Sequence, residues 1–154
     1  MEERDSDSKA GQDFLLSDFG ECFRQMSHYD SQIVDIFKFA FFGYSSVLGV
    51  SIGLYKFGIE KKINFVIPAA SIILVGLIVG LLVFILIIRN RVYFVVVTRY
   101  VNELRAHFLK NKPLGFENKS GMYTDFHQPS YFDFWSSQLF ASYMISFFNA
   151  TLLA

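Results

Sequence analysis

Residues 63–88, INFVIPAASIILVGLIVGLLVFILII, form a stretch of 26 positions without a charged side chain. A helix of this length rises about 39 Å, whereas the apolar core of a bilayer is about 30 Å thick. Because the stretch is apolar on every side, its helix must be surrounded by apolar groups on every side. It therefore predicts a membrane span and places the chain among all-α, integral membrane helical proteins.

A second uncharged stretch, of 17 residues, precedes it at residues 39–55. Apolar residues extend this stretch back to residue 33, and the flanking Asp35 and Lys38 can reach lipid headgroups. Only KFGIEKK, residues 56–62, separates the two stretches, so we predict a transmembrane hairpin over residues 33–88. Each span contains a GxxxG pair, which lets helix backbones approach closely. The candidate helix-packing residues are Gly49, Gly53, Gly76 and Gly80.

The N-terminal region is predicted to have two parts. Residues 1–13 are polar and acidic, the reverse of the basic start of a secretory signal, and we expect them to be disordered. Residues 14–32 have apolar residues at steps of three and four, which predicts an amphipathic helix. Two placements remain open for it, on the membrane surface or packed within an oligomer.

Basic residues are distributed unevenly around the hairpin. Eleven of the 14 Lys and Arg residues flank it, before residue 39 or within residues 89–119, and three lie in the turn. The positive-inside rule then places both flanks in the cytoplasm. We predict a multi-pass protein of the cell inner membrane with a cytoplasmic N terminus.

Residues 89–130 are predicted to be a cytoplasmic basic helix, ending near residue 110, followed by a loop. The helix either continues out of the second span or lies along the membrane surface. The basic face of the helix has two interpretations. It can anchor the protein to anionic lipid, or it can bind an anionic ligand such as a nucleotide through charge-assisted hydrogen bonds in an oligomer. The candidate contacts to lipid or ligand are Arg91, Arg99, Arg105 and Lys110.

Residues 131–154 are predicted to be a third hydrophobic helix, within which residues 134–154 carry no charge. It is either a third span or a segment in the membrane interface. Four polar residues recur on one face of it, where contact with lipid would cost free energy. This stripe either bonds to other helices or lines a pore. Its members are Gln138, Ser142, Ser146 and Asn149.

Motifs for chemistry are not found in the sequence. It has no phosphate-binding glycine loop, no nucleophile elbow and no conspicuous ionisable residue within the spans. A single Cys22 and three widely spaced histidines give no ligand set for a metal. We therefore predict neither an enzyme nor a cofactor or metal site.

The acidic N terminus, the tight hairpin, the basic segment RNRVYFVVVTRYVNELR and the further apolar segment resemble small bacterial inner-membrane effectors of phage-defence systems. The resemblance is architectural, so no site residue is carried over. It implies an oligomeric membrane part that breaches the membrane after a partner or nucleotide signal.

The predicted function is thus a homo-oligomeric pore or channel-type effector, gated from the cytoplasmic side by a partner or anionic ligand. The alternative is a non-conducting membrane anchor or scaffold that docks a soluble partner through its cytoplasmic helix. The partners implied are the lipid bilayer, further copies of the chain, and a soluble cytoplasmic protein or nucleotide-type ligand.

Overall fold

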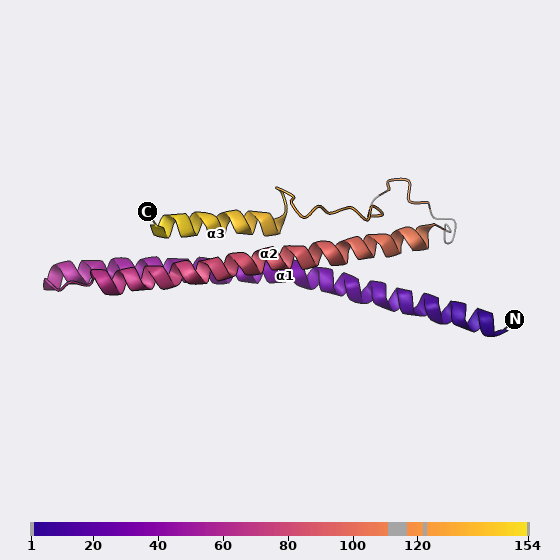
Figure 1. Cartoon of the computed structure of the whole chain (residues 1–154), viewed down its shortest axis with the longest axis horizontal. Coiled ribbons are helices and arrows are strands. Elements are labelled where there is room, and N and C mark those ends of the chain that lie inside the picture. Colours follow the sequence, from indigo (N-terminus) through magenta and orange to yellow (C-terminus); the bar gives the residue numbers. More distant parts are fainter. Residues whose placement is uncertain (1, 111–116, 122, 154) are drawn as a thin grey trace. The chain divides into compact units, whose positions relative to one another are not determined.

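The computed structural model describes residues 2–110, 117–121 and 123–153, and it is all-α with three helices (Figure 1). These are α1 (Glu2–Lys61), α2 (Val66–Leu109) and α3 (Ser137–Leu153). The chain divides into two compact units. The bundle unit comprises Ser31–Asn90 and Phe134–Ala154, and the loop unit comprises Met1–Asp30 and Arg91–Asp133.

Helix α1 is continuous from Glu2, which corrects two predictions. Residues 2–13 are helical rather than disordered, and no break separates the amphipathic segment from the first apolar stretch. The chain has no proline before residue 68, and a glycine inside a helix, such as Gly11 or Gly20, costs only about 1 kcal/mol. Nothing in the sequence therefore interrupts the backbone hydrogen bonds of the helix.

The turn between the first two helices lies later than predicted. Residues 56–61 complete α1, and Lys62 then adopts a left-handed conformation with φ of 58°. Its N–H donates to the Ile59 carbonyl at 3.3 Å, and the Ile63 N–H donates to the Gly58 carbonyl at 3.0 Å. This pair of bonds is a Schellman motif, here with lysine in the position that glycine usually takes. Gly58 is itself required, because a Cβ there would lie 2.8 Å from the Ile63 oxygen.

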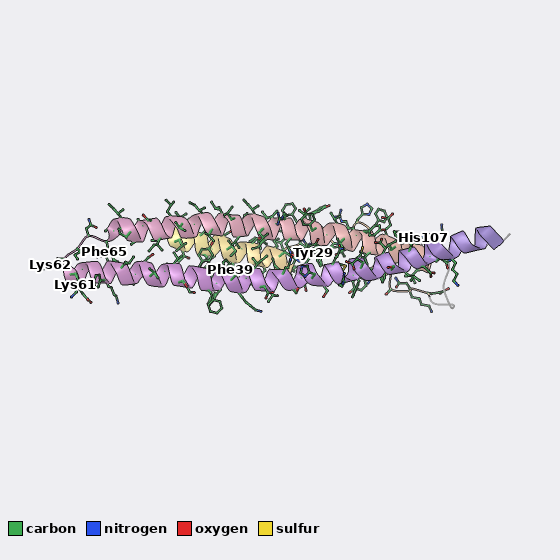
Figure 2. The ribbon with its side chains drawn as sticks, turned by 90° about the horizontal axis from the view of Figure 1, so that it is seen from below. Tyr29, Phe39, Lys61, Lys62, Phe65 and His107 are labelled. Atoms are coloured by element: carbon green, nitrogen blue, oxygen red, sulfur yellow. The ribbon has the colours of Figure 1, made fainter. Side chains whose placement is uncertain are left out.

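Helix α2 begins at Val66 because Asn64 caps it. The Asn64 Oδ1 accepts a hydrogen bond from the Val66 N–H at 3.0 Å, as expected of an N-cap residue. Figure 2 shows Lys61, Lys62 and Phe65 at this turn. The helix then continues without interruption to Leu109, for about 66 Å. The predicted basic helix is therefore the continuation of the second apolar stretch.

By length and composition, α1 and α2 can each cross a membrane. Only 17% and 22%, respectively, of their most apolar stretches are buried inside the protein. A core helix of a soluble protein is instead covered on most sides. These two helices therefore present their apolar surfaces outward.

Helix α3 is shorter than the helix predicted over residues 131–154. It has 17 residues and rises about 26 Å. Ser136 sets its start, because the Ser136 Oγ accepts a hydrogen bond from the Leu139 N–H at 3.3 Å. A third span stays a prediction for this helix.

The core of the bundle unit is formed by all three helices, and α3 runs beside α2 in Figure 1. Small and β-branched side chains at the centre let the helices approach. The buried cluster consists of Ile33, Ala40, Tyr44, Val83, Ile87, Ala141, Ile145 and Leu152.

Candidate functional site

In the loop unit, arginine side chains on α2 hold the segment that follows the helix. Arg91 is buried, and its Nε donates a hydrogen bond to the Tyr131 carbonyl at 3.3 Å. Its Nη2 donates a second hydrogen bond to the Ser130 carbonyl. About two helical turns further on, Arg99 donates from Nε to the Pro129 carbonyl at 3.1 Å. The Arg99 guanidinium also lies 4.6 Å from the centre of the Tyr131 ring, a cation–π geometry.

Asn102 completes this row of donors. Its Nδ2 donates to the carbonyls of Asp125 at 3.1 Å and Gln128 at 2.9 Å. As the donors advance along α2, the carbonyls they bind recede along the loop, so the loop runs antiparallel to the helix. Backbone carbonyls outside helices and sheets need such partners when they are removed from water. The row of donors therefore explains how a segment without secondary structure is positioned.

The electrostatic setting of Arg91 reflects this structural role. Burial lowers the pKa of its guanidinium below the ordinary value, and the nearby Asp133 partly opposes the shift. Arginine nevertheless stays charged at every physiological pH. The charge is thus committed to the loop and is not displayed on the surface.

Arg105 occupies a different environment. Its guanidinium lies over the rings of Phe19, Phe23 and Tyr123, at 5.4, 5.9 and 5.2 Å from their centres. No hydrogen bond or ion pair joins it to any residue that the structure describes. Lys110 is exposed just beyond the end of α2. The four predicted basic contacts therefore do not form one exposed surface, and Arg105 faces a cavity.

That cavity has a volume of about 660 Å³ and lies within the loop unit. Residues from α1, α2 and the loop form its wall. They are Phe23, Met26, Phe94, Thr98, Asn102, Arg105, Gly121, Tyr123, Asp125, Gln128 and Pro129. Helical spacing predicted Arg105 but not the loop residues, because a segment without periodicity gives no signal of which helix face it returns to.

In the bundle unit, three of the four residues of the predicted polar stripe are buried or half-buried. Gln138 and Ser142 are buried, and Asn149 is half-buried. Tyr44 of α1 donates a hydrogen bond from its hydroxyl to the Asn149 Oδ1 at 2.7 Å. Ser146 is exposed, and its hydroxyl donates to the Ser142 carbonyl on the same helix at 2.9 Å. Tyr44 was not predicted as the partner of this stripe, because no sequence pattern pairs residues on two separate helices.

The two GxxxG pairs have different surroundings. A Cβ at Gly76 would lie 3.0 Å from Val47, and one at Gly80 would overlap the Tyr44 hydroxyl and the Asn149 Oδ1. Gly80 thus lies directly beneath the Tyr44–Asn149 hydrogen bond, where α1, α2 and α3 meet. Gly49 and Gly53 have nothing within 4 Å of an added Cβ. The second pair therefore packs within the chain, and the first pair faces open space.

Three aromatic side chains shortly before α3 are largely accessible, and one of them, Phe132, is 84% exposed. Phe134 is 75% exposed, and Trp135, the single tryptophan of the chain, is 96% exposed. Aromatic residues of this kind are enriched where membrane helices meet the headgroup region. Their exposure agrees with such a position at the start of α3.

Reactive and metal-binding groups are scarce in the part of the chain that the structure describes. Within it, no three His, Cys, Asp or Glu residues are grouped to hold a metal ion. Cys22 is buried, and its burial, with the charges of Asp18 and Glu21, raises the pKa of the thiol. The nucleophilic thiolate is therefore disfavoured.

Comparisons with known proteins add no functional assignment. No model of a known protein family matches the chain, and no curated protein or solved structure is detectably similar to it. Its function must be inferred from its own geometry.

Proposed function

We propose that the protein is an inner-membrane anchor or scaffold whose loop unit presents a docking site to the cytoplasm. The main support is that the protein itself buries only 17% of the most apolar stretch of α1 and 22% of that of α2. Lipid is the solvent that such surfaces match, and helices satisfy their own backbone groups within it. The long basic continuation of α2 then emerges on the cytoplasmic side, where basic residues prevail.

The contacts of the polar stripe support an anchor over a pore. A pore lining must face an aqueous axis, whereas Gln138 and Ser142 are buried within the protein and Asn149 accepts a hydrogen bond from Tyr44 of α1. Polar groups placed in this way join helices. They leave the stripe without a continuous face for conducting ions.

Membrane topology tests the anchor. In a Cys22→Ser background, one variant carries Lys61→Cys near the turn and another carries Lys119→Cys in the loop unit, both at exposed positions. A membrane-impermeant maleimide should label the Lys61→Cys variant in intact cells, and the Lys119→Cys variant only after permeabilisation. Recovery of the protein in the soluble fraction, or labelling of both variants in intact cells, would contradict the proposal.

One observation favours a second candidate, a homo-oligomeric pore of the phage-defence type. Gly49 and Gly53 form an unoccupied close-packing face on α1, and small residues of this kind permit helix association in membranes. Several copies are needed to enclose a path for ions. In this candidate the exposed Ser146 faces the axis between copies.

Bilayer recording separates the two candidates. The pore predicts current from the reconstituted protein, loss of oligomer and current in Gly53→Leu, and altered conductance with intact assembly in Ser146→Leu. The anchor predicts no current from the same preparation. Cross-linking before reconstitution supplies the oligomeric state for each variant.

A further inference from the structure

The cavity of the loop unit has the size and composition of a small-molecule site. Its volume of about 660 Å³ falls within the range of roughly 300–1,000 Å³ that is typical of ligand pockets. Phe23, Met26, Phe94 and Pro129 give the wall an apolar character, and a few polar side chains interrupt it. Such sites bind an apolar body and use the polar groups to orient it.

Arg105 supplies an unused cation to this wall. Three aromatic rings hold its guanidinium by their faces at 5.2–5.9 Å. Ring faces do not accept the in-plane N–H groups of a guanidinium as a carboxylate does, and these groups have no hydrogen-bond acceptor among residues 2–110, 117–121 and 123–153. A planar fork of donors suits a carboxylate or phosphate oxygen pair.

Asn102 supplies an unused acceptor on the same wall. It is 2% exposed, and its Nδ2 is committed to two loop carbonyls. That commitment fixes the orientation of the amide and leaves the Oδ1 buried without a hydrogen bond in the described part of the chain. A buried acceptor without a donor costs free energy. A ligand N–H would supply the missing donor.

Among the described residues of the wall, Asp125 is the other charged side chain. Its Oδ1 accepts a hydrogen bond from the His127 backbone N–H at 2.8 Å, and it forms no ion pair with Arg105. Its negative charge disfavours a ligand with more than one anionic group. The site therefore combines one cation, one unsatisfied acceptor, aromatic surfaces and one repulsive carboxylate.

We propose that this cavity binds a planar nitrogen heterocycle that carries an N–H group and one carboxylate or singly charged phosphate. The anionic group binds Arg105, the ring packs against Phe23 and Tyr123, and the N–H donates to Asn102. The proposal gives the ligand class for the docking role above. It depends on the proposed function in one respect only, namely that the ligand reaches the cavity from the cytoplasm.

Calorimetry on the full chain in detergent micelles, with empty micelles as the blank, tests the site. Indole-3-acetate and orotate are the probes, and each should bind saturably. Indole-3-acetamide, which lacks the charge, should bind about tenfold more weakly or worse, as expected when a charge-assisted hydrogen bond is lost. The N-methylated probe 1-methylindole-3-acetate should also lose affinity, because it cannot donate to Asn102.

Matched variants locate the binding. Arg105→Gln should remove the preference for indole-3-acetate over indole-3-acetamide. Arg24→Gln is the control, because Arg24 lies in the same unit but is exposed and paired with Glu21; its binding should equal that of the wild type. Absence of saturable binding by both probes, or equal affinity of the wild type for the acid and the amide, would overturn the proposal.

The wild-type comparisons keep the test decisive if Arg105→Gln does not fold. Because binding is measured in micelles, it does not depend on topology. Failure of the maleimide experiment with retained binding would remove the cytoplasmic anchor and leave the ligand site, and the reverse result would remove only the ligand site.

Discussion

The bundle unit and the loop unit both use polar side chains, but for different partners. In the bundle unit, Tyr44 and Asn149 join two helices whose backbones are already hydrogen-bonded, and glycines let the helices approach. In the loop unit, Arg91, Arg99 and Asn102 bind carbonyls of a segment that has no backbone ladder. Helix α2 contributes to both units. Its apolar half packs closely against other helices through small residues, and its polar half binds loop carbonyls through side-chain hydrogen-bond donors.

The largest effect is expected where a charged donor is removed from the loop. Arg91→Gln cannot reach both carbonyls of the native arrangement, and hydrogen bonds to charged groups contribute about 1.5–3 kcal/mol. We expect the free energy of unfolding to fall by about 3 kcal/mol, with faster hydrogen exchange in residues 125–133. Arg89→Gln, at a neighbouring exposed position, should change neither quantity. Equal effects of the two variants would contradict the role of Arg91 in holding the loop.

The next effect separates the two glycine pairs. Gly80→Ala places a methyl group against the Tyr44 hydroxyl and the Asn149 Oδ1, and overpacking of this kind costs about 1–3 kcal/mol. Gly53→Ala meets open space and gains up to about 1 kcal/mol from helix propensity. Thermal unfolding in detergent should therefore shift in opposite directions. A fall in stability for the Gly53 variant would indicate that this face is already occupied.

A smaller effect is expected from the hydrogen bond between helices. Tyr44→Phe removes the donor to Asn149, and bonds of this kind in membrane helices contribute about 0.6 kcal/mol. Tyr143→Phe, at an exposed position of α3, should be neutral. A double-mutant cycle with Asn149→Ala isolates the pair. If the coupling energy were as large as the loss of stability in Arg91→Gln, polar side chains would contribute equally in the two units, which would contradict the comparison.

The smallest effect is a pH dependence in the loop unit. The Tyr100 hydroxyl donates to the Asp18 carboxylate at 2.6 Å, and this bond raises the pKa of the phenol. A folded-state pKa above the unfolded value stabilises the protein below about pH 10, the ordinary phenol pKa, and the stabilisation is lost as pH rises through the folded value. The difference in stability between the wild type and Tyr100→Phe should therefore vanish at high pH. A difference that persists there would exclude titration of Tyr100 as its source.

Hydropathy predicted the two long apolar helices and the all-α class, because uncharged stretches of this length leave few alternatives to a helix. The exact ends depended on single side chains. Lys62 takes a left-handed conformation without being glycine, and Asn64 and Ser136 cap the helices that follow them. A capping residue is recognised from sequence only when the helix it caps is already known.

The candidate site was less predictable than the fold. Helical spacing puts Arg91, Asn102 and Arg105 on one face of α2, but spacing does not show whether such a face meets solvent, lipid or its own chain. The return of the loop along α2 decided this, and it depends on tertiary contacts over 23–40 residues. The inward orientation of Gln138 likewise became visible only once three helices were packed together.

The fluorescence of Trp135 can report how deep one point of the protein lies in a bilayer. As the single tryptophan, almost wholly accessible at the start of α3, it reports the polarity of one defined point in whatever surrounds the protein. In vesicles, its emission wavelength and its quenching by lipids brominated at successive carbons would give the distance of that point from the bilayer centre. The start of the shortest helix can thus be located without any added label.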